Sequence, residues 1–474
     1  MHKRSQYGIH IIAALVVLPF VVLAAYCHPY YDDYSTAIML KQTGFWTYFV
    51  DTYQHWSGRY AFLLANIGHP LRFGGLRAYQ WGAAGLVAGL VGSCYVLAWG
   101  LTAGSQLPKA PRLALGSGLT VTVLALLPSP AEGFYWVLGG YNYTLPILVG
   151  FGGLAAGGGY AAAVSPVRRR LLLLGMLGAA ALFPGFSEFS ACLTLVLAGG
   201  LLAAFPRAGR TYWLLAAVAA GGTLAMLAAP GNLGRLHQTA YKWHLLHDVG
   251  QALGATAYTL LNWLAFPACW LLAALALPLV ERIAAGEGAV ARLTRRPFLW
   301  PLLLLLGLAG CYCFSYLAVH LPVPQRARNL LYAYFIVTLL LSLVGAVQLA
   351  QRRGWARPRV APSVLLGLLV LALLGDGNGR LRSEAIGRGY NTVGLAYRDW
   401  LSGDAARFDA AERHRYALLR TTAADSVGVP PLPVMPATLS YYDIGPSSRF
   451  WGNQVLALYF GKKAVWVQPT APVK

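Results

Sequence analysis

The stretch "GIHIIAALVVLPFVVLAAYCHPYYDDYS", residues 8–35, joins a charge-free apolar run to two adjacent carboxylates. Its apolar part, 8–25, is about as long as a helix needs to cross the ~30 Å hydrocarbon core of a bilayer. The run follows basic residues, as in a secretory signal peptide, but it exceeds the usual ~7 to 15 apolar residues, and Tyr26 does not suit a cleavage site. We therefore predict an uncleaved first membrane span that ends just before Asp32 and Asp33.

The rest of the chain has the composition of a membrane protein. Of its 474 residues, 57% are hydrophobic and only 11% are charged, far from the average of soluble domains. Further apolar stretches lie at 81–101, 113–127, 145–164, 171–183, 189–205, 213–229, 255–280, 298–319, 330–349 and 362–374. We therefore expect an all-α polytopic membrane protein with about eleven transmembrane helices, of which 171–183 and 362–374 are short.

The basic residues predict how the chain is oriented. With the N-terminus inside, seventeen Lys and Arg residues fall in inner loops and eight in the longer outer loops, as expected when positive charge is retained on the cytoplasmic side. The net charge of +21 is thus explained by topology and attraction to anionic lipid headgroups, not by nucleic-acid binding. We predict a multi-pass protein of a bacterial cytoplasmic (inner) membrane, with its C-terminal part outside.

The acidic residues indicate which side carries chemistry. Before the C-terminal segment, the predicted outer acids are Asp32, Asp33, Asp51, Glu132, Glu188 and Asp248. Only two acids fall inside, and the middle of every predicted span is free of Asp, Glu, Lys and Arg. Because proton-coupled transporters use charged residues within their spans, this pattern favours a site at the outer face over a pump.

Two segments are predicted to lie outside the spans. The first outer loop, 27–77, contains aromatic residues at three- and four-residue intervals, which predicts an amphipathic helix in the outer interface; these residues are Trp46, Phe49, Tyr53, Trp56 and Tyr60. Residues 376–474 are charged and then Pro-rich, which predicts a small extracytoplasmic α+β domain beside a transmembrane domain of 1–375.

Five short motifs occur in a fixed order along the chain. They are "DD" at Asp32–Asp33, "WSGR" at Trp56–Arg59, "FYWVLGGYNYTLP" at 134–146, "APGNLGR" at 229–235 and "FWGNQVLALYFG" at 450–461. In this order they resemble an uncharacterised bacterial family of polytopic membrane proteins related to the GT-C glycosyltransferases. That resemblance implies a GT-C-like fold and transfer of a sugar from a polyprenyl-phosphate-linked donor to a cell-envelope glycan or lipid.

Sugar transfer needs a base near the acceptor hydroxyl, and a partly buried carboxylate suits this role. Asp33 or Asp32 is the candidate, with Asp33 slightly favoured. The alternative is that the pair only caps the following helix.

Cations near the leaving phosphate are the second requirement, because guanidinium groups bind phosphate oxygens with two hydrogen bonds. The candidates are Arg59, Arg235, Arg326 and Arg328. The alternative for each is an arginine that extends toward ordinary lipid headgroups.

Aromatic, amide and carboxylate side chains could bind the sugar or the acceptor. The candidates are Glu132, Tyr135, Trp136, Tyr141, Asn142, Glu188 and Asn232. The aromatic residues could equally form an interfacial belt, and Glu188 could hold either an arginine or a sugar hydroxyl. Asp443 and Asn453 could contact an acceptor or tie the C-terminal domain to the membrane part.

No metal or cofactor is assigned. His244 and His247 could share a helical face beside Asp248, but no H-E-x-x-H pattern accompanies them. Binding of a divalent metal is kept as an alternative. The expected partners are a lipid-linked sugar donor, an envelope acceptor and membrane lipids. The alternatives to a glycosyltransferase are a flippase or transporter of lipid-linked sugars and an envelope polysaccharide polymerase or ligase.

Overall fold

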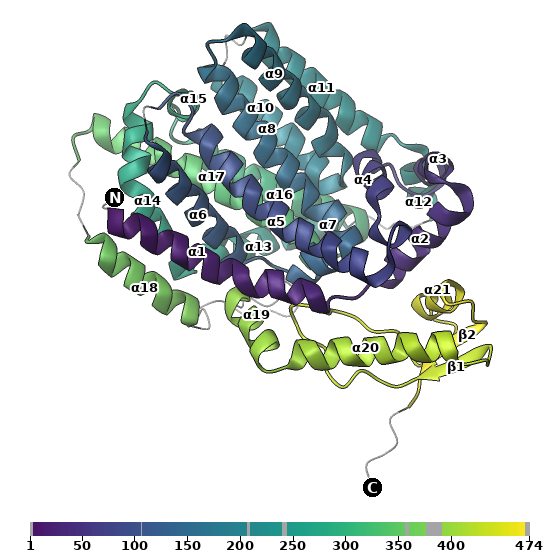
Figure 1. Ribbon diagram of the computed structural model, residues 1–474. Helices are drawn as coiled ribbons and strands as arrows, with labels where there is room; N and C mark the ends of the chain where they lie inside the picture. Colours follow the sequence, from purple (N-terminus) through teal and green to yellow (C-terminus); the bar gives the residue numbers. More distant parts are fainter. Residues whose placement is uncertain are drawn as a thin grey trace.

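The computed structural model describes residues 3–105, 107–205, 209–238, 244–355, 360–375 and 391–469. Helices make up nearly all of the regular structure in these ranges, and the described strands form one two-stranded sheet near the C-terminus (Figure 1). The prediction of a helical protein is therefore confirmed.

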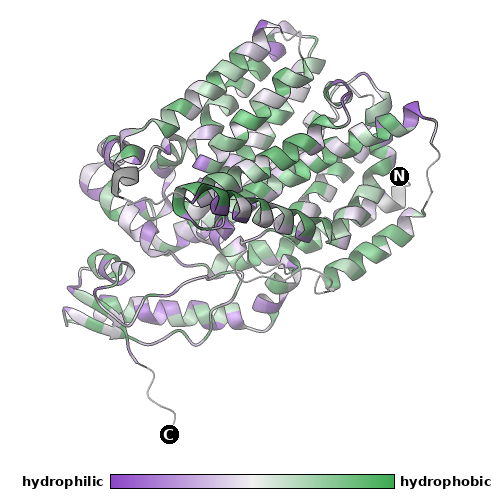
Figure 2. Ribbon diagram, turned by 180° about the vertical axis from the view of Figure 1, so that it is seen from behind, coloured by the Kyte–Doolittle hydropathy of each residue, from purple (hydrophilic) through white to green (hydrophobic). Residues whose placement is uncertain are grey.

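Six described segments are long and apolar enough to cross a membrane. They correspond to α1 (Lys3–Leu23), α5 (Gly75–Leu101), α7 (Val137–Tyr143) with α8 (Leu145–Ala162), α14 (Pro267–Ala285), α16 (Leu299–Val319) and α17 (Gln325–Arg352). Hydrophobic residues dominate the helices of this bundle, whereas hydrophilic residues are frequent in the C-terminal segment (Figure 2). The chain thus has the apolar helices of a membrane protein, as its composition predicts.

The remaining predicted spans coincide with shorter helices. These are α6 (Lys109–Ala125), α9 (Pro166–Leu182), α10 (Glu188–Ala204), α11 (Arg210–Leu227) and α18 (Pro362–Leu374). A helix of 17 residues, such as α6, is ~25 Å long, which is near the lower limit for crossing a bilayer. The total of eleven crossings therefore stays a prediction.

One predicted span is wrong in its boundaries. Residues 255–280 were expected to form a single helix, but the chain divides there into α13 (Leu245–Leu264) and α14. Phe266 has extended backbone angles, φ −79° and ψ 113°, because the residue before a proline is pushed away from the helical region. Pro267 then begins α14, where its missing N–H is not needed.

Two features of the bundle position the site. About two thirds of the apolar window of α17 is buried inside the protein, the largest share among the six candidate spans. α5 and α8 pack backbone to backbone, since a Cβ on Gly158 would lie 2.1 Å from the Gly100 carbonyl oxygen. Small residues thus bring these helices together, and α17 presents its N-terminal residues at one end of a packed core.

The first outer loop differs from its prediction. It forms α2 (Tyr31–Thr43), α3 (Phe45–His55) and α4 (Tyr60–Ala65) instead of one amphipathic helix. Gly44 separates α2 from α3, because its φ of 77° lies in the left-handed region that glycine adopts most easily. Trp46 on α3 is exposed as predicted, whereas the Tyr60 hydroxyl turns inward and donates to the Ala181 carbonyl.

The C-terminal segment follows α18 and lies against the first outer loop (Figure 1). It contains α19 (Thr392–Leu401), α20 (Asp404–Thr421), β1 (Ser426–Val429), α21 (Trp451–Tyr459) and β2 (Ala464–Val467), and the two strands are parallel. α21 approaches α2 closely, since a Cβ on Gly452 would lie 2.7 Å from the Tyr31 ring. This contact lies at the start of α2, next to the two aspartates.

Candidate functional site

Asp33 is a fully buried structural acceptor at the start of α2. Its carboxylate accepts hydrogen bonds from the Tyr30 backbone N–H at 2.8 Å, the Tyr79 hydroxyl at 2.7 Å and the Leu138 backbone N–H at 3.3 Å. Because the bond to Tyr30 satisfies an N–H just before the helix, Asp33 fulfils the capping role that was the alternative to catalysis. Its side chain has no exposed surface.

His69 completes this buried network and was not anticipated. Its Nε2 lies 3.6 Å from an Asp33 carboxylate oxygen, and its side chain has no exposed surface. Neither ring nitrogen has a hydrogen-bond partner among the described residues. A lone histidine before a proline gives no sequence signal for such a contact, which joins residues on separate elements.

Asp32, the neighbouring residue, is only half-buried. Partial burial, followed by the negative charge of Asp33, raises the pKa of Asp32 to about 6, while the positive charge of Arg326 opposes this shift. Within the described part of the chain, Asp32 takes part in no ion pair. Its carboxyl group therefore combines access, a nearby cation and a pKa close to neutrality.

Arg326, at the start of α17, faces the loop before α7. Its Nη1 lies 3.1 Å from a carboxylate oxygen of Glu132, which is buried. Its guanidinium carbon lies 5.6 Å from the centre of the Trp136 ring, within the range of a cation–π interaction. The Tyr441 ring, 5.8 Å from that of Trp136, adds a residue of the C-terminal segment to this group.

Arg328, two residues further along α17, is buried and less well satisfied. Its side chain is only 8% exposed, and its Nε has no hydrogen-bond partner among the described residues. Tyr312, Glu132 and Tyr258 interact with it electrostatically, but none of the described carboxylates forms an ion pair with it. A buried cation without a paired carboxylate is costly and is suited to receive an anion.

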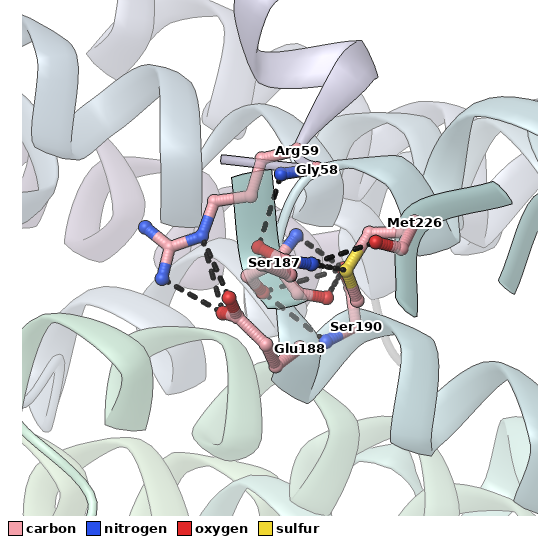
Figure 3. Close-up of polar contacts among 7 residues, drawn as sticks. Gly58, Arg59, Ser187, Glu188, Ser190 and Met226 are labelled. Atoms are coloured by element: carbon pink, nitrogen blue, oxygen red, sulfur yellow. Dashed lines mark hydrogen bonds and ion pairs between the residues drawn. The ribbon is translucent and has the colours of Figure 1, made fainter. Parts of the chain in front are cut away.

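Arg59 and Glu188 form the most complete ion pair of the site (Figure 3). Arg59 Nε and Nη2 donate to the Glu188 carboxylate at 2.7–3.2 Å. When the side-chain amide of Asn142 is oriented with its oxygen toward Arg59, that oxygen accepts a hydrogen bond from Arg59 Nη1 at 2.9 Å. Of the two partners considered for Glu188, the structure has an arginine, and Ser187 caps the helix that Glu188 begins.

The "WSGR" and "APGN" motifs contact each other. Asn232 accepts a hydrogen bond from the Gly58 N–H at 3.0 Å and donates to the Met226 carbonyl at 2.7 Å. A Cβ on Gly58 would lie 2.2 Å from that carbonyl oxygen, so only glycine fits. Asn232 thus holds the backbone that carries Arg59, and a contact to a sugar stays a prediction.

The structure does not place three further candidate residues with the charged residues described above. Tyr135 is fully buried, and its hydroxyl donates to the Phe20 carbonyl at 2.8 Å. The Tyr141 hydroxyl donates to the Gly68 carbonyl at 3.0 Å. Arg235 lies on α12 (Pro230–Gln238), and its side chain is outside the described residues.

The histidine-rich segment forms no metal centre in the described part of the chain. Asp248 contacts His320 at 3.1 Å instead of the nearby histidines, and His244 and His247 are exposed. No group of three or more His, Cys, Asp or Glu side chains among the described residues could hold a metal ion.

The contact between α20 and the first outer loop contains a second polar cluster. His28 lies 2.9 Å from an Asp409 carboxylate oxygen and 3.2 Å from the Tyr416 hydroxyl. Arg415 donates to both carboxylate oxygens of Asp443, at 2.8 and 2.9 Å. Asp443 therefore stabilises the C-terminal segment, the second of the two roles considered for it.

Asn453 has a similar structural role. Its amide accepts from the Gly445 N–H and donates to the carbonyls of Gly445 and Val465, at 2.7–3.0 Å. It joins the loop before α21 to β2. Its hydrogen bonds therefore hold the C-terminal segment together.

The site is therefore one continuous group of charges. Arg59 and Arg326 interact electrostatically with each other and with Tyr143, and Arg326 interacts with Asp32. We call Asp32, Arg59, Glu132, Glu188, Arg326 and Arg328 the Asp32 cluster. Comparisons with protein-family models, with curated proteins and with solved structures find no match to this chain.

Proposed function

We propose that the chain is a membrane glycosyltransferase that uses the Asp32 cluster to move a sugar from a polyprenyl-phosphate-linked donor to a cell-envelope glycan or lipid. The observation that carries the proposal is Asp32, a half-buried carboxyl group with a pKa of about 6 that interacts electrostatically with Arg326. A general base is most effective when its pKa lies near the working pH. Asp33 is fully buried and accepts three hydrogen bonds, which favours Asp32 over it.

The chemistry is a single inverting displacement. The acceptor hydroxyl oxygen attacks the anomeric carbon, its proton passes to Asp32, and the bond between that carbon and the phosphate oxygen breaks. The phosphate leaves with the electron pair and stays on the lipid. Its charge needs fixed positive groups, and Arg328 is the best candidate because the carboxylates Glu132 and Glu188 already pair with Arg326 and Arg59.

Sugar recognition is assigned to the aromatic side of the cluster. The Trp136 and Tyr441 rings lie together next to Arg326, and a flat ring can stack on the apolar face of a sugar. We place this site at the outer face of a bacterial inner membrane, with the N-terminus inside. The C-terminal segment then lies outside, where Tyr441 joins the membrane part.

The test is sugar transfer by the purified protein in liposomes, with a panel of radiolabelled polyprenyl-phosphate sugars and envelope-lipid acceptors. The proposal predicts a labelled product with a new glycosidic bond. Labelled donor that crosses the bilayer without a new bond would instead identify a flippase.

A further inference from the structure

An apolar groove runs along the bundle away from the Asp32 cluster. It lies among α1, α6, α14 and α17 and encloses an empty volume of about 980 Å³, part of it open to the surroundings. Its walls include Leu119, Leu275, Pro278 and Leu339. Pro278 lies inside α14, and because proline has no backbone N–H, that helix lacks one hydrogen bond there.

The groove has the length of a lipid chain. On α14 its lining extends from Cys269 to Arg282, which corresponds to ~20 Å of helix. One leaflet of a ~30 Å hydrocarbon core is ~15 Å deep. The groove is therefore long enough to accommodate a single acyl chain.

One end of the groove is closed. The Tyr332 hydroxyl donates to the Thr122 carbonyl at 2.9 Å and lies 3.9 Å from Cys269 Sγ. Thr122 and Cys269 both line the groove, so Tyr332 bridges its two walls. Tyr332 is also one helical turn beyond Arg328 on α17, so the closed end is the one nearer to Arg328.

The opposite end is positively charged. Arg282 is exposed, and the other described residues that line the groove carry no charge. Pro111 also lines this end, two residues after the exposed Lys109 at the N-terminus of α6. A negative headgroup is favoured near such cations and near a helix N-terminus.

We propose that this groove binds an anionic phospholipid, with one acyl chain along the groove and the phosphate against Arg282. The apolar walls select a lipid chain, and Arg282 selects the charge of the headgroup. The site is separate from the Asp32 cluster, and the proposal does not depend on the enzymatic function.

The charge is tested by native mass spectrometry of the purified full chain, titrated with phosphatidylglycerol and with phosphatidylcholine of the same acyl chains. We expect phosphatidylglycerol to bind more tightly than phosphatidylcholine. Arg282→Gln should weaken the binding of phosphatidylglycerol about fivefold, which is the effect of one cation near an anionic headgroup. The binding of phosphatidylcholine should not change. Arg295→Gln is the control, because Arg295 is exposed and lies outside the groove lining. Equal binding of both lipids to the wild type would overturn the proposal.

The groove itself is tested by filling it. Gly118 lines the groove, and a Cβ there meets no atom within 4 Å, so the Gly118→Leu side chain has room to enter it. We expect this change to reduce binding of both lipids, whereas Gly92→Leu, at an equally open position on α5 outside the lining, leaves it unchanged. Unaltered binding in a folded Gly118→Leu protein would overturn the proposal.

A photoreactive acyl chain gives a test without any substitution. Phosphatidylglycerol with such a chain should crosslink to peptides of the four helices that line the groove, α1, α6, α14 and α17. Crosslinks confined to other helices would contradict the assigned groove.

Discussion

The Asp32 cluster and the contact between α20 and the first outer loop are both rich in buried charge, but they differ in how that charge is paired. At the α20 contact, Arg415 pairs with Asp443 and Glu412, and His28 pairs with Asp409. In the Asp32 cluster, Arg328 and Asp32 make no ion pair with any described residue. Buried charges that are fully paired hold a structure together, whereas unpaired ones are costly unless a ligand uses them. From this difference we propose that the α20 contact serves stability and the Asp32 cluster serves chemistry.

The largest expected effect is on catalysis by Asp32. We expect Asp32→Asn to lower the rate of sugar transfer by ~10²–10⁴-fold, because general-base catalysis is typically worth that much, and to leave the melting temperature unchanged. Asp33→Asn should instead lower the melting temperature, since it disturbs a buried acceptor of three hydrogen bonds. Full transfer activity in Asp32→Asn would contradict the assignment of the base.

The next largest effect is expected at Arg328. Arg328→Gln removes a fixed cation from the leaving phosphate, and loss of one such group costs ~10² in turnover. The matched control is Arg295→Gln, which changes an exposed arginine outside the Asp32 cluster. Turnover at the wild-type level in Arg328→Gln would show that this buried cation is structural.

A smaller effect is expected at the α20 contact, and it falls on stability. Arg415→Gln leaves Asp443 and Glu412 without their partner, and we expect a loss of about 2 kcal/mol, reduced from the full cost of a buried pair because Asp443 is 21% exposed. Thermal unfolding measures this loss, and the transfer rate per folded molecule should stay the same. A fall in that rate with unchanged stability would place Arg415 in the site.

Much of the fold could be predicted from composition and apolar runs, because span length and charge are local properties of the sequence. The break before Pro267 was missed because the apolar run continues through it. The separate helices α3 and α4 were missed for a similar reason, since the aromatic spacing extends across Gly58.

The site could be predicted only in part. The residue types and the order of motifs indicated Asp32, Arg59, Glu188 and Arg326, but not which of them would pair. The contacts of His69 with Asp33 and of His28 with Asp409 join distant segments, and no spacing in the sequence encodes them. The burial that distinguishes Asp32 from Asp33 likewise depends on Tyr79 and on the loop before α7.

The pH dependence of the transfer rate tests the central claim most directly. Asp32 must be ionised to accept a proton, and burial raises its pKa to about 6. We therefore predict a rate that is constant above that pH and falls about tenfold for each unit below it. Asp33→Asn should move the inflection to lower pH, because the negative charge of Asp33 helps to raise the pKa of Asp32. A wild-type rate that stays constant from pH 5 to pH 8 would contradict Asp32 as the base.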